Sequence, residues 1–132
     1  YCCASESALR DCLRGLCDKG VLSESSAKVH SFRSGLFRNV VYERQALSQR
    51  VALHAQLARW LHRRQTDPAQ LPVAARMRTV HHIHAGQVAK GQLSEYLLRC
   101  FQCDHDEAPT TLSLEAYFRV AERYWKGQIE GL

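Results

Sequence analysis

Apolar residues recur at helical spacing along most of this chain. Between residues 5 and 17 they fall three or four positions apart, which places them on one face of a helix that starts at Ser5 and ends before Gly20. The same spacing, interrupted by Gly and Pro, predicts five further helices. These cover residues 35–42, 47–64, 73–85, from 88 or 92 to 103, and 114–125, the last capped by Thr111 or Ser113.

One segment of the N-terminal third favours a β-strand. Residues 28–32 are the best strand candidate, and they follow a turn at Gly20 and the polar run SESSAK. A helix, a turn, a polar loop and a strand make up the back half of a winged helix. We therefore expect a mainly α fold in which residues 1–45 are the C-terminal part of a winged-helix element. Residues 46–132 are expected to form antiparallel helical hairpins stacked as a tetratricopeptide-like α-solenoid, without a strict repeat.

The stretch VHSFRSGLFRNVVYERQALSQRVALHAQLARWL, residues 29–61, carries a longer motif. It resembles the junction that follows the ATPase core in signal-transduction ATPases, the STAND branch of the AAA+ class. In that family a winged-helix element leads into helical repeats that are often tetratricopeptide-like. The resemblance covers about residues 8–100, and the chain has Ser34 where the family has a His. The matching positions, in order, are Phe32, Leu36, Phe37, Val40, Val41, Tyr42, Leu47, Arg50, Leu53, His54, Ala58 and Leu61.

The resemblance implies a role for the chain but no chemistry within it. It indicates a non-catalytic regulatory and scaffolding segment of a larger cytoplasmic signalling ATPase, whose ATP and Mg²⁺ sites lie outside these residues. The stretch from Tyr42 to Leu61 is most similar to chains associated with soluble adenylyl cyclases, which form cAMP. The partners it implies are other domains of the same chain and other proteins. No catalytic or cofactor-binding residue is expected here.

Two other functions fit the same pattern. A stand-alone tetratricopeptide-type adaptor would bind a peptide in a concave groove, and a P-loop upstream of Tyr1 would favour the ATPase over it. A winged helix can also bind DNA, and the first helix offers Arg10 and Arg14. The wing loop, however, carries Glu24 and no basic cluster, whereas a DNA-binding wing is normally basic. Nucleic acid is therefore not an expected partner.

Composition bounds the remaining possibilities. The chain has 132 residues, enough for one domain or two small units, and its start at Tyr1 indicates a segment of a longer protein. Its net charge of +5 is attributed to solvated helix faces. No apolar run approaches the roughly 18 residues of a membrane span.

None of the six Cys lies between residues 18 and 99, which favours reduced thiols inside the cell over a secreted disulfide framework. Glycine-rich phosphate loops are absent.

Two pairs of metal-ligating residues are spaced three apart. His81 and His84 fall on one predicted helix, and Cys100 and Cys103 fall on the next. If the helices face each other, the four side chains offer a tetrahedral zinc site. The spacing matches no common zinc finger, so the favoured interpretation is that no metal binds and that the histidines pack or cap. A redox role for the Cys pair lacks the βαβ context of such sites.

The remaining candidates are structural. The run Asp104 to Glu107 is interpreted as a solvated linker. Arg50 and His54 lie four apart on one helix face, where they form either an interdomain latch or a weak surface pair. We also expect one buried cluster to join the winged element to the first hairpin, so that Trp60→Ala lowers the melting temperature sharply. Its members are Phe32, Leu36, Tyr42, Leu53, Leu57 and Trp60.

Overall fold

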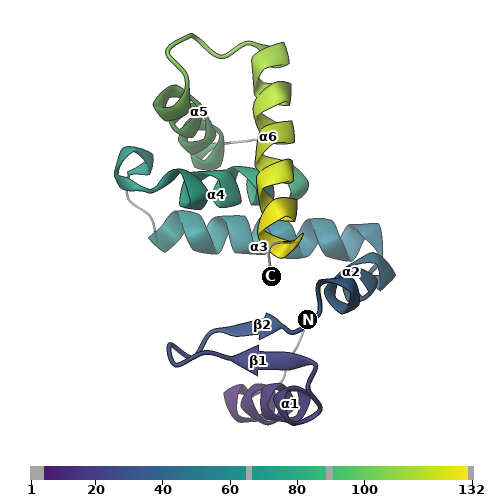
Figure 1. Ribbon diagram of the computed structural model, residues 1–132. Helices are drawn as coiled ribbons and strands as arrows, with labels where there is room; N and C mark the ends of the chain where they lie inside the picture. Colours follow the sequence, from purple (N-terminus) through teal and green to yellow (C-terminus); the bar gives the residue numbers. More distant parts are fainter. Residues whose placement is uncertain (1–4, 65–66, 89–90, 131–132) are drawn as a thin grey trace. The chain divides into compact units, whose positions relative to one another are not determined.

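The computed structural model describes residues 5–64, 67–88 and 91–130. Within these ranges it contains six α-helices, one short 3₁₀ helix and one two-stranded sheet, so the prediction of a mainly α fold is confirmed (Figure 1). The chain divides into two compact units after Arg44. They are called here the N-terminal unit and the C-terminal unit. The division lies one residue before the boundary expected from the sequence. Cys2 and Cys3 lie outside the described residues.

The N-terminal unit consists of a helix, a β-hairpin and a second helix. Helix α1 covers Glu6–Asp18, strands β1 and β2 cover Leu22–Glu24 and His30–Phe32, and helix α2 covers Gly35–Arg44. The Ser5 hydroxyl accepts a hydrogen bond from the Ala8 amide at 3.1 Å, which satisfies one free amide of the first helical turn. Ser5, where the sequence predicts the start of the helix, is therefore its N-cap, although no Glu follows to complete a capping box.

The β-hairpin corrects the sequence-based expectation of a single strand. The antiparallel register pairs Leu22 with Phe32 and Glu24 with His30. Strand β1 was taken for a turn and polar loop because its three residues contain one apolar side chain, too few to show an alternating pattern. Lys28 has a φ of 62° in the hairpin loop, a left-handed conformation uncommon for a residue other than glycine. The assignment of this unit to a winged helix stays a prediction.

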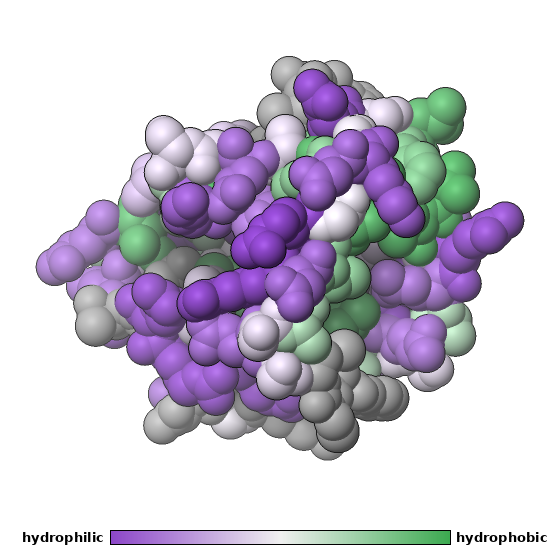
Figure 2. Space-filling model, turned by 90° about the horizontal axis from the view of Figure 1, so that it is seen from below, coloured by the Kyte–Doolittle hydropathy of each residue, from purple (hydrophilic) through white to green (hydrophobic). Residues whose placement is uncertain are grey.

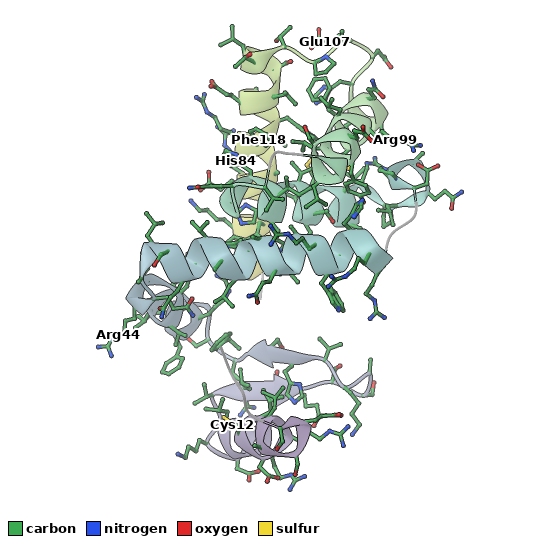
Figure 3. The ribbon with its side chains drawn as sticks, turned by 180° about the vertical axis from the view of Figure 1, so that it is seen from behind. Cys12, Arg44, His84, Arg99, Glu107 and Phe118 are labelled. Carbon is green, nitrogen blue, oxygen red and sulfur yellow. The ribbon has the colours of Figure 1, made fainter. Side chains whose placement is uncertain are left out.

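Apolar side chains of the N-terminal unit are largely exposed. Among its described residues, Leu22 is the one buried hydrophobic side chain, whereas Leu36 on α2 is 76 % exposed. The thiol-bearing side chain of Cys12 on α1 is also exposed (Figure 3). Seen from below, apolar side chains appear at the surface among hydrophilic ones (Figure 2).

The C-terminal unit contains four helices and a short 3₁₀ segment. Helices α3, α4, α5 and α6 cover Leu47–Arg64, Val73–Ala85, Gln92–Asp104 and Thr111–Glu130, and the 3₁₀ helix η1 covers Pro68–Gln70. The bounds of α3 and α4 agree with the prediction. Helix α6 starts three residues earlier than predicted. Thr110, rather than Thr111 or Ser113, caps it, because the Thr110 hydroxyl accepts from the Ser113 amide and the Ser113 hydroxyl accepts from the Thr110 amide.

Helix α4 is the centre of the C-terminal unit. It contacts α3, α5 and α6, and its side chains from Val80 to Ile83 are buried. Helices α3 and α4 run antiparallel as a hairpin, and α6 crosses them at a steep angle (Figure 1). The hairpin fits the predicted organisation, while the solenoid arrangement stays a prediction. The core consists of Ala55, Ala58, Met77, Val80, Ile83, Val88, Leu93, Tyr96, Leu97, Cys100, Phe101, Tyr117 and Ala121.

A buried ion pair ties four segments of this unit together. Arg76 of α4 bonds to both carboxylate oxygens of Asp104 at the end of α5, the shorter contact being 2.6 Å, and donates to the carbonyls of Pro68 and Leu71. The Tyr117 hydroxyl on α6 donates to Asp104 at 2.6 Å. Burial opposes ionisation of Asp104, but these hydrogen bonds hold its pKa below the usual value. Asp104 is thus part of the packed structure, which corrects its interpretation as solvated linker.

Within the described residues, no helix is both long enough and apolar enough to cross a membrane.

Candidate functional site

Three histidines meet in the interior of the C-terminal unit. His54 comes from α3, and His81 and His82 are neighbours on α4. All three are buried, and one ring nitrogen from each lies within 4.8 Å of the others. Among the described residues, this is the one place where three or more His, Cys, Asp or Glu side chains gather closely enough to hold a metal ion.

Close packing of two helices creates this cluster. A Cβ added to Gly86, which caps α4, would lie 2.5 Å from the backbone nitrogen of Ala55. Only a residue without a side chain allows α3 to approach α4 so closely at this point. His54 immediately precedes Ala55 and is therefore held against α4, where its Nδ1 lies 2.8 Å from Nδ1 of His82. One of these nitrogens donates and the other accepts.

His81 has a different environment from the other two rings. Its ring stacks on Trp125 of α6, with 4.5 Å between centroids, and meets the His54 ring edge to face at 5.3 Å. Both of its ring nitrogens are buried, and neither has a hydrogen-bond partner among the described residues. A buried polar atom without a partner is costly and rare in folded proteins. His81 is therefore the most informative residue of the cluster.

The two buried histidines of α4, His81 and His82, are held neutral at pH 7 by lowered pKa values. Burial, with a smaller repulsion from His54, lowers the pKa of His81 to about 4, although Glu122 acts in the opposite direction. Burial, and then repulsion from His81 and His54, lowers the pKa of His82 to about 3. At neutral pH each ring keeps one unprotonated nitrogen, which can accept a hydrogen bond or bind a metal.

The Cys₂His₂ set, which the sequence offered only as a disfavoured alternative to packing histidines, does not assemble. His84 is exposed and stacks on Phe118 of α6 at 4.1 Å (Figure 3). Cys103 is exposed, whereas Cys100 is buried and burial raises its pKa to about 12. Such a site requires the two pairs to face each other, but His84 faces α6. Of the four, only His81 belongs to a group with metal-ligand spacing.

The predicted buried cluster is also corrected. Leu53 is 52 % and Trp60 45 % exposed, and Leu57 and Leu36 are exposed as well, while Phe32 and Tyr42 are half-buried. On α3 the side turned to α4 carries His54, Ala55, Ala58 and Leu61 instead. Periodicity identified a stripe of large apolar residues. The close approach of α3 to α4 at Gly86, however, favours burial of the neighbouring stripe, whose side chains are smaller.

Arg50 and His54, the two candidate latch residues, also differ in their burial. His54 is buried against His82, so its interpretation as a surface pair with Arg50 is wrong. Arg50 is half-buried, and its role as an interdomain latch stays a prediction. The motif's Leu-His pair thus places one residue on each side of α3, with Leu53 outward and His54 inward.

The outward side of α3 forms a shallow apolar surface with a basic rim. Leu53, Leu57 and Trp60 are its apolar members, called here the α3 stripe, and Arg59 and Arg63 flank them. The Arg64 guanidinium lies over the Trp60 ring, 4.7 Å from its centroid. Helix α3 contains four Arg and no Asp or Glu.

Comparison of this chain with protein-family models, with curated proteins and with solved structures finds no match.

The sequence held a partial signal for the histidine cluster. The run His81-His82-x-His84 was singled out, and His54 lies on the same helical side as Ala55 and Ala58. Small residues at this spacing favour close helix packing. The sequence did not show which helix packs against that side of α3, because a contact between residues far apart in the chain leaves no local pattern.

Proposed function

We propose that this chain is a non-catalytic regulatory and scaffolding segment of a larger signal-transduction ATPase, of the soluble adenylyl cyclase type. The observation that supports this most directly is the α3 stripe, since Leu53, Leu57 and Trp60 are exposed beside a well-packed core. Large apolar side chains grouped at a surface are typical of sites that contact another protein surface.

The charge around the stripe indicates the chemistry of what contacts it. Arg59 and Arg63 flank the apolar residues, and no acidic side chain lies on this helix. A matching surface therefore combines apolar side chains with Asp or Glu. We propose that another domain of the parent ATPase provides this surface, so that α3 transmits the state of the ATPase to the helical region.

Ion pairing in the N-terminal unit supports this role over DNA binding. Arg10 pairs with Glu6 and Arg14 lies 3.7 Å from Asp11 on α1, while Lys28 lies 3.7 Å from Glu24 in the hairpin. These carboxylates reduce the positive potential that phosphate contacts require. A winged-helix surface that packs against its own protein has no such requirement.

The parent sequence and a parent-protein assay together test the proposal. We expect a P-loop upstream of Tyr1 and ATP hydrolysis by the full parent protein. Leu57→Asp, which puts a negative charge in the α3 stripe, should change the regulated rate of ATP hydrolysis or cAMP formation. Ser48→Asp, on an exposed polar position of the same helix, is the matched control and should leave it unchanged.

Two results would overturn the proposal. A parent protein without a P-loop would favour the stand-alone tetratricopeptide-type adaptor, for which the α3 stripe would be a peptide-binding surface. A parent ATPase whose regulation is the same with Leu57→Asp and with Ser48→Asp would remove the stripe from any regulatory role.

A further inference from the structure

We propose that His54, His81 and His82 together bind one zinc ion between α3 and α4. This inference goes beyond the proposed function and is independent of it. It rests on three observations within the C-terminal unit: the shared position of the three ring nitrogens, the two His81 nitrogens without a partner among the described residues, and the close approach of α3 and α4 at Gly86.

The positions of the nitrogens suit a small ion. One nitrogen from each ring lies within 4.8 Å of the others. In a tetrahedral zinc site with Zn–N bonds of about 2.0–2.1 Å, neighbouring ligand nitrogens are about 3.3 Å apart. The His54 and His82 nitrogens are at 2.8 Å, so a small opening of this pair admits the ion. The ion then replaces one hydrogen bond with two metal bonds.

The unpartnered ring of His81 gives the strongest indication of a ligand. At 6 % exposure neither of its nitrogens is positioned to bond to bulk water, and no protein group among the described residues bonds to them. A histidine kept only for packing would be replaceable by an apolar ring at lower cost. A metal ion satisfies one of these nitrogens directly.

The donor set selects the class of metal. Three neutral imidazoles suit zinc and other late transition metals, whereas Mg²⁺ and Ca²⁺ prefer oxygen ligands. Three protein nitrogens leave the fourth tetrahedral position open. The carboxylate that acts electrostatically on His81 is that of Glu122, which also pairs with Lys126 at 2.9 Å. It partly offsets the positive charge of the ion.

A zinc ion in this position would link two helices. His54 belongs to α3, while both other ligands belong to α4, so the ion links the two helices of the first hairpin. The unit gains stability from zinc because the unfolded chain lacks the preformed site. We therefore expect a stabilising role and derive no catalytic one.

The first experiment is zinc titration of the 132-residue chain after removal of metals with EDTA. Calorimetry with ZnCl₂ should give one ion per chain, and the melting temperature should rise with zinc concentration. His54→Gln and His82→Gln should each lower the zinc affinity by at least about 100-fold, since even loss of a residue that only supports a ligand costs 10–100-fold. His84→Gln is the matched control, because this exposed histidine of the same helix lies outside the cluster, and it should bind zinc as the wild type does.

The second experiment needs no substitution and therefore remains decisive if a variant fails to fold. X-ray absorption of the zinc-loaded wild-type chain should show three imidazole nitrogens at about 2.0–2.1 Å. A sulfur ligand at about 2.3 Å would overturn the proposal and favour a site with Cys100 or Cys103. Absence of saturable zinc binding, or equal loss of affinity in His84→Gln and His54→Gln, would also overturn it.

Discussion

Both units of this chain contain α-helices with apolar side chains, but the units differ in how much of that apolar surface they bury. In the N-terminal unit, Leu22 is the one buried hydrophobic side chain among residues 5–44, and Leu36 and Phe37 of α2 are exposed. In the C-terminal unit, a continuous core extends over α3, α4, α5 and α6. Amphipathic helices are therefore not sufficient for a core. A second apolar face at the right distance is also required, and α4 provides it only in the C-terminal unit.

This difference has a thermodynamic consequence. Burial of apolar surface is the main favourable contribution to folding, at about 25 cal/mol per Å². The described residues of the N-terminal unit bury a single apolar side chain, which offsets little of their loss of conformational entropy on folding. We infer that most of the measured stability resides in the C-terminal unit. Substitutions in the C-terminal unit should therefore destabilise the protein more than equivalent substitutions in the N-terminal unit.

The largest effect is expected where the C-terminal unit buries charge. Asp104→Asn removes the charged partner of Arg76 and should destabilise the protein by about 3–5 kcal/mol, because a buried charge left without its partner is costly. Urea unfolding measures the change. Asp106→Asn, two residues away and exposed, is the control and should change stability by less than about 0.5 kcal/mol. Equal effects would show that the ion pair is not formed in solution.

A matched pair of leucines compares the two units directly. Leu97 on α5 is 5 % exposed, and Leu36 on α2 is 76 % exposed. Leu97→Ala should cost about 2–5 kcal/mol, the usual range for a buried leucine, whereas Leu36→Ala should cost less than about 0.5 kcal/mol. If Leu36→Ala were equally destabilising, the N-terminal unit would have a core that its own described residues do not provide, and the contrast would fail.

Acid should weaken the C-terminal unit through its histidines. The folded-state pKa values of His81 and His82, about 4 and about 3, lie below the value of about 6.5 expected in the unfolded chain, so protonation favours unfolding. Their contribution is complete above about pH 6.5 and is lost as the pH falls toward 4. With about 1.4 kcal/mol per pKa unit, the loss for His81 alone is on the order of 3 kcal/mol.

Urea unfolding in EDTA at a series of pH values from 7.5 to about 4 measures this dependence. His82→Gln should reduce its slope, because one of the buried titrating groups is removed. His84→Gln, at an exposed position of the same helix, should leave the slope unchanged. A wild-type stability that does not vary between pH 6.5 and 4 would contradict the burial of these rings.

Two glycines test helix approach in the two units. Gly86→Ala would place a Cβ 2.5 Å from the Ala55 nitrogen and should destabilise by about 1–3 kcal/mol, since α3 must move away from α4. Gly15 in α1 has nothing within 4 Å of such a Cβ, so Gly15→Ala should stabilise by about 0.5–1 kcal/mol through helix propensity. Thermal unfolding distinguishes the two signs. A neutral Gly86→Ala would show that the helices are not in contact there.

The smallest effect is expected on the outward side of α3. Trp60 is 45 % exposed and its ring contacts Arg64, so Trp60→Ala should cost only about 1 kcal/mol. This replaces the sharp loss of stability predicted from the sequence. Arg63→Ala, at an exposed position nearby, should have a still smaller effect in the same melting experiment. A loss of 3 kcal/mol or more for Trp60→Ala would show that the ring is buried after all.

Local sequence signals were sufficient to locate the helices and, for α3 and α4, both of their ends. Periodic apolar positions with Gly and Pro between them placed α3 and α4 correctly, because these signals act within one or two turns of the chain. Helix α6 was also recognised, but its start was missed by three residues because Thr110 caps it in partnership with Ser113. Strand β1 was missed because three residues are too few to establish a period.

Which helix faces meet depends on packing between segments that are far apart in the chain. His54 and His82 are 28 residues apart in the chain, as are Arg76 and Asp104, and neither pair has a local signal. Both arise because α4 packs between α3 and the helices that follow. Local periodicity gives each helix an apolar side, but the packing of whole helices selects the side that is buried. Here the absence of a side chain at Gly86 brought the small residues of α3 inward and left Trp60 outside.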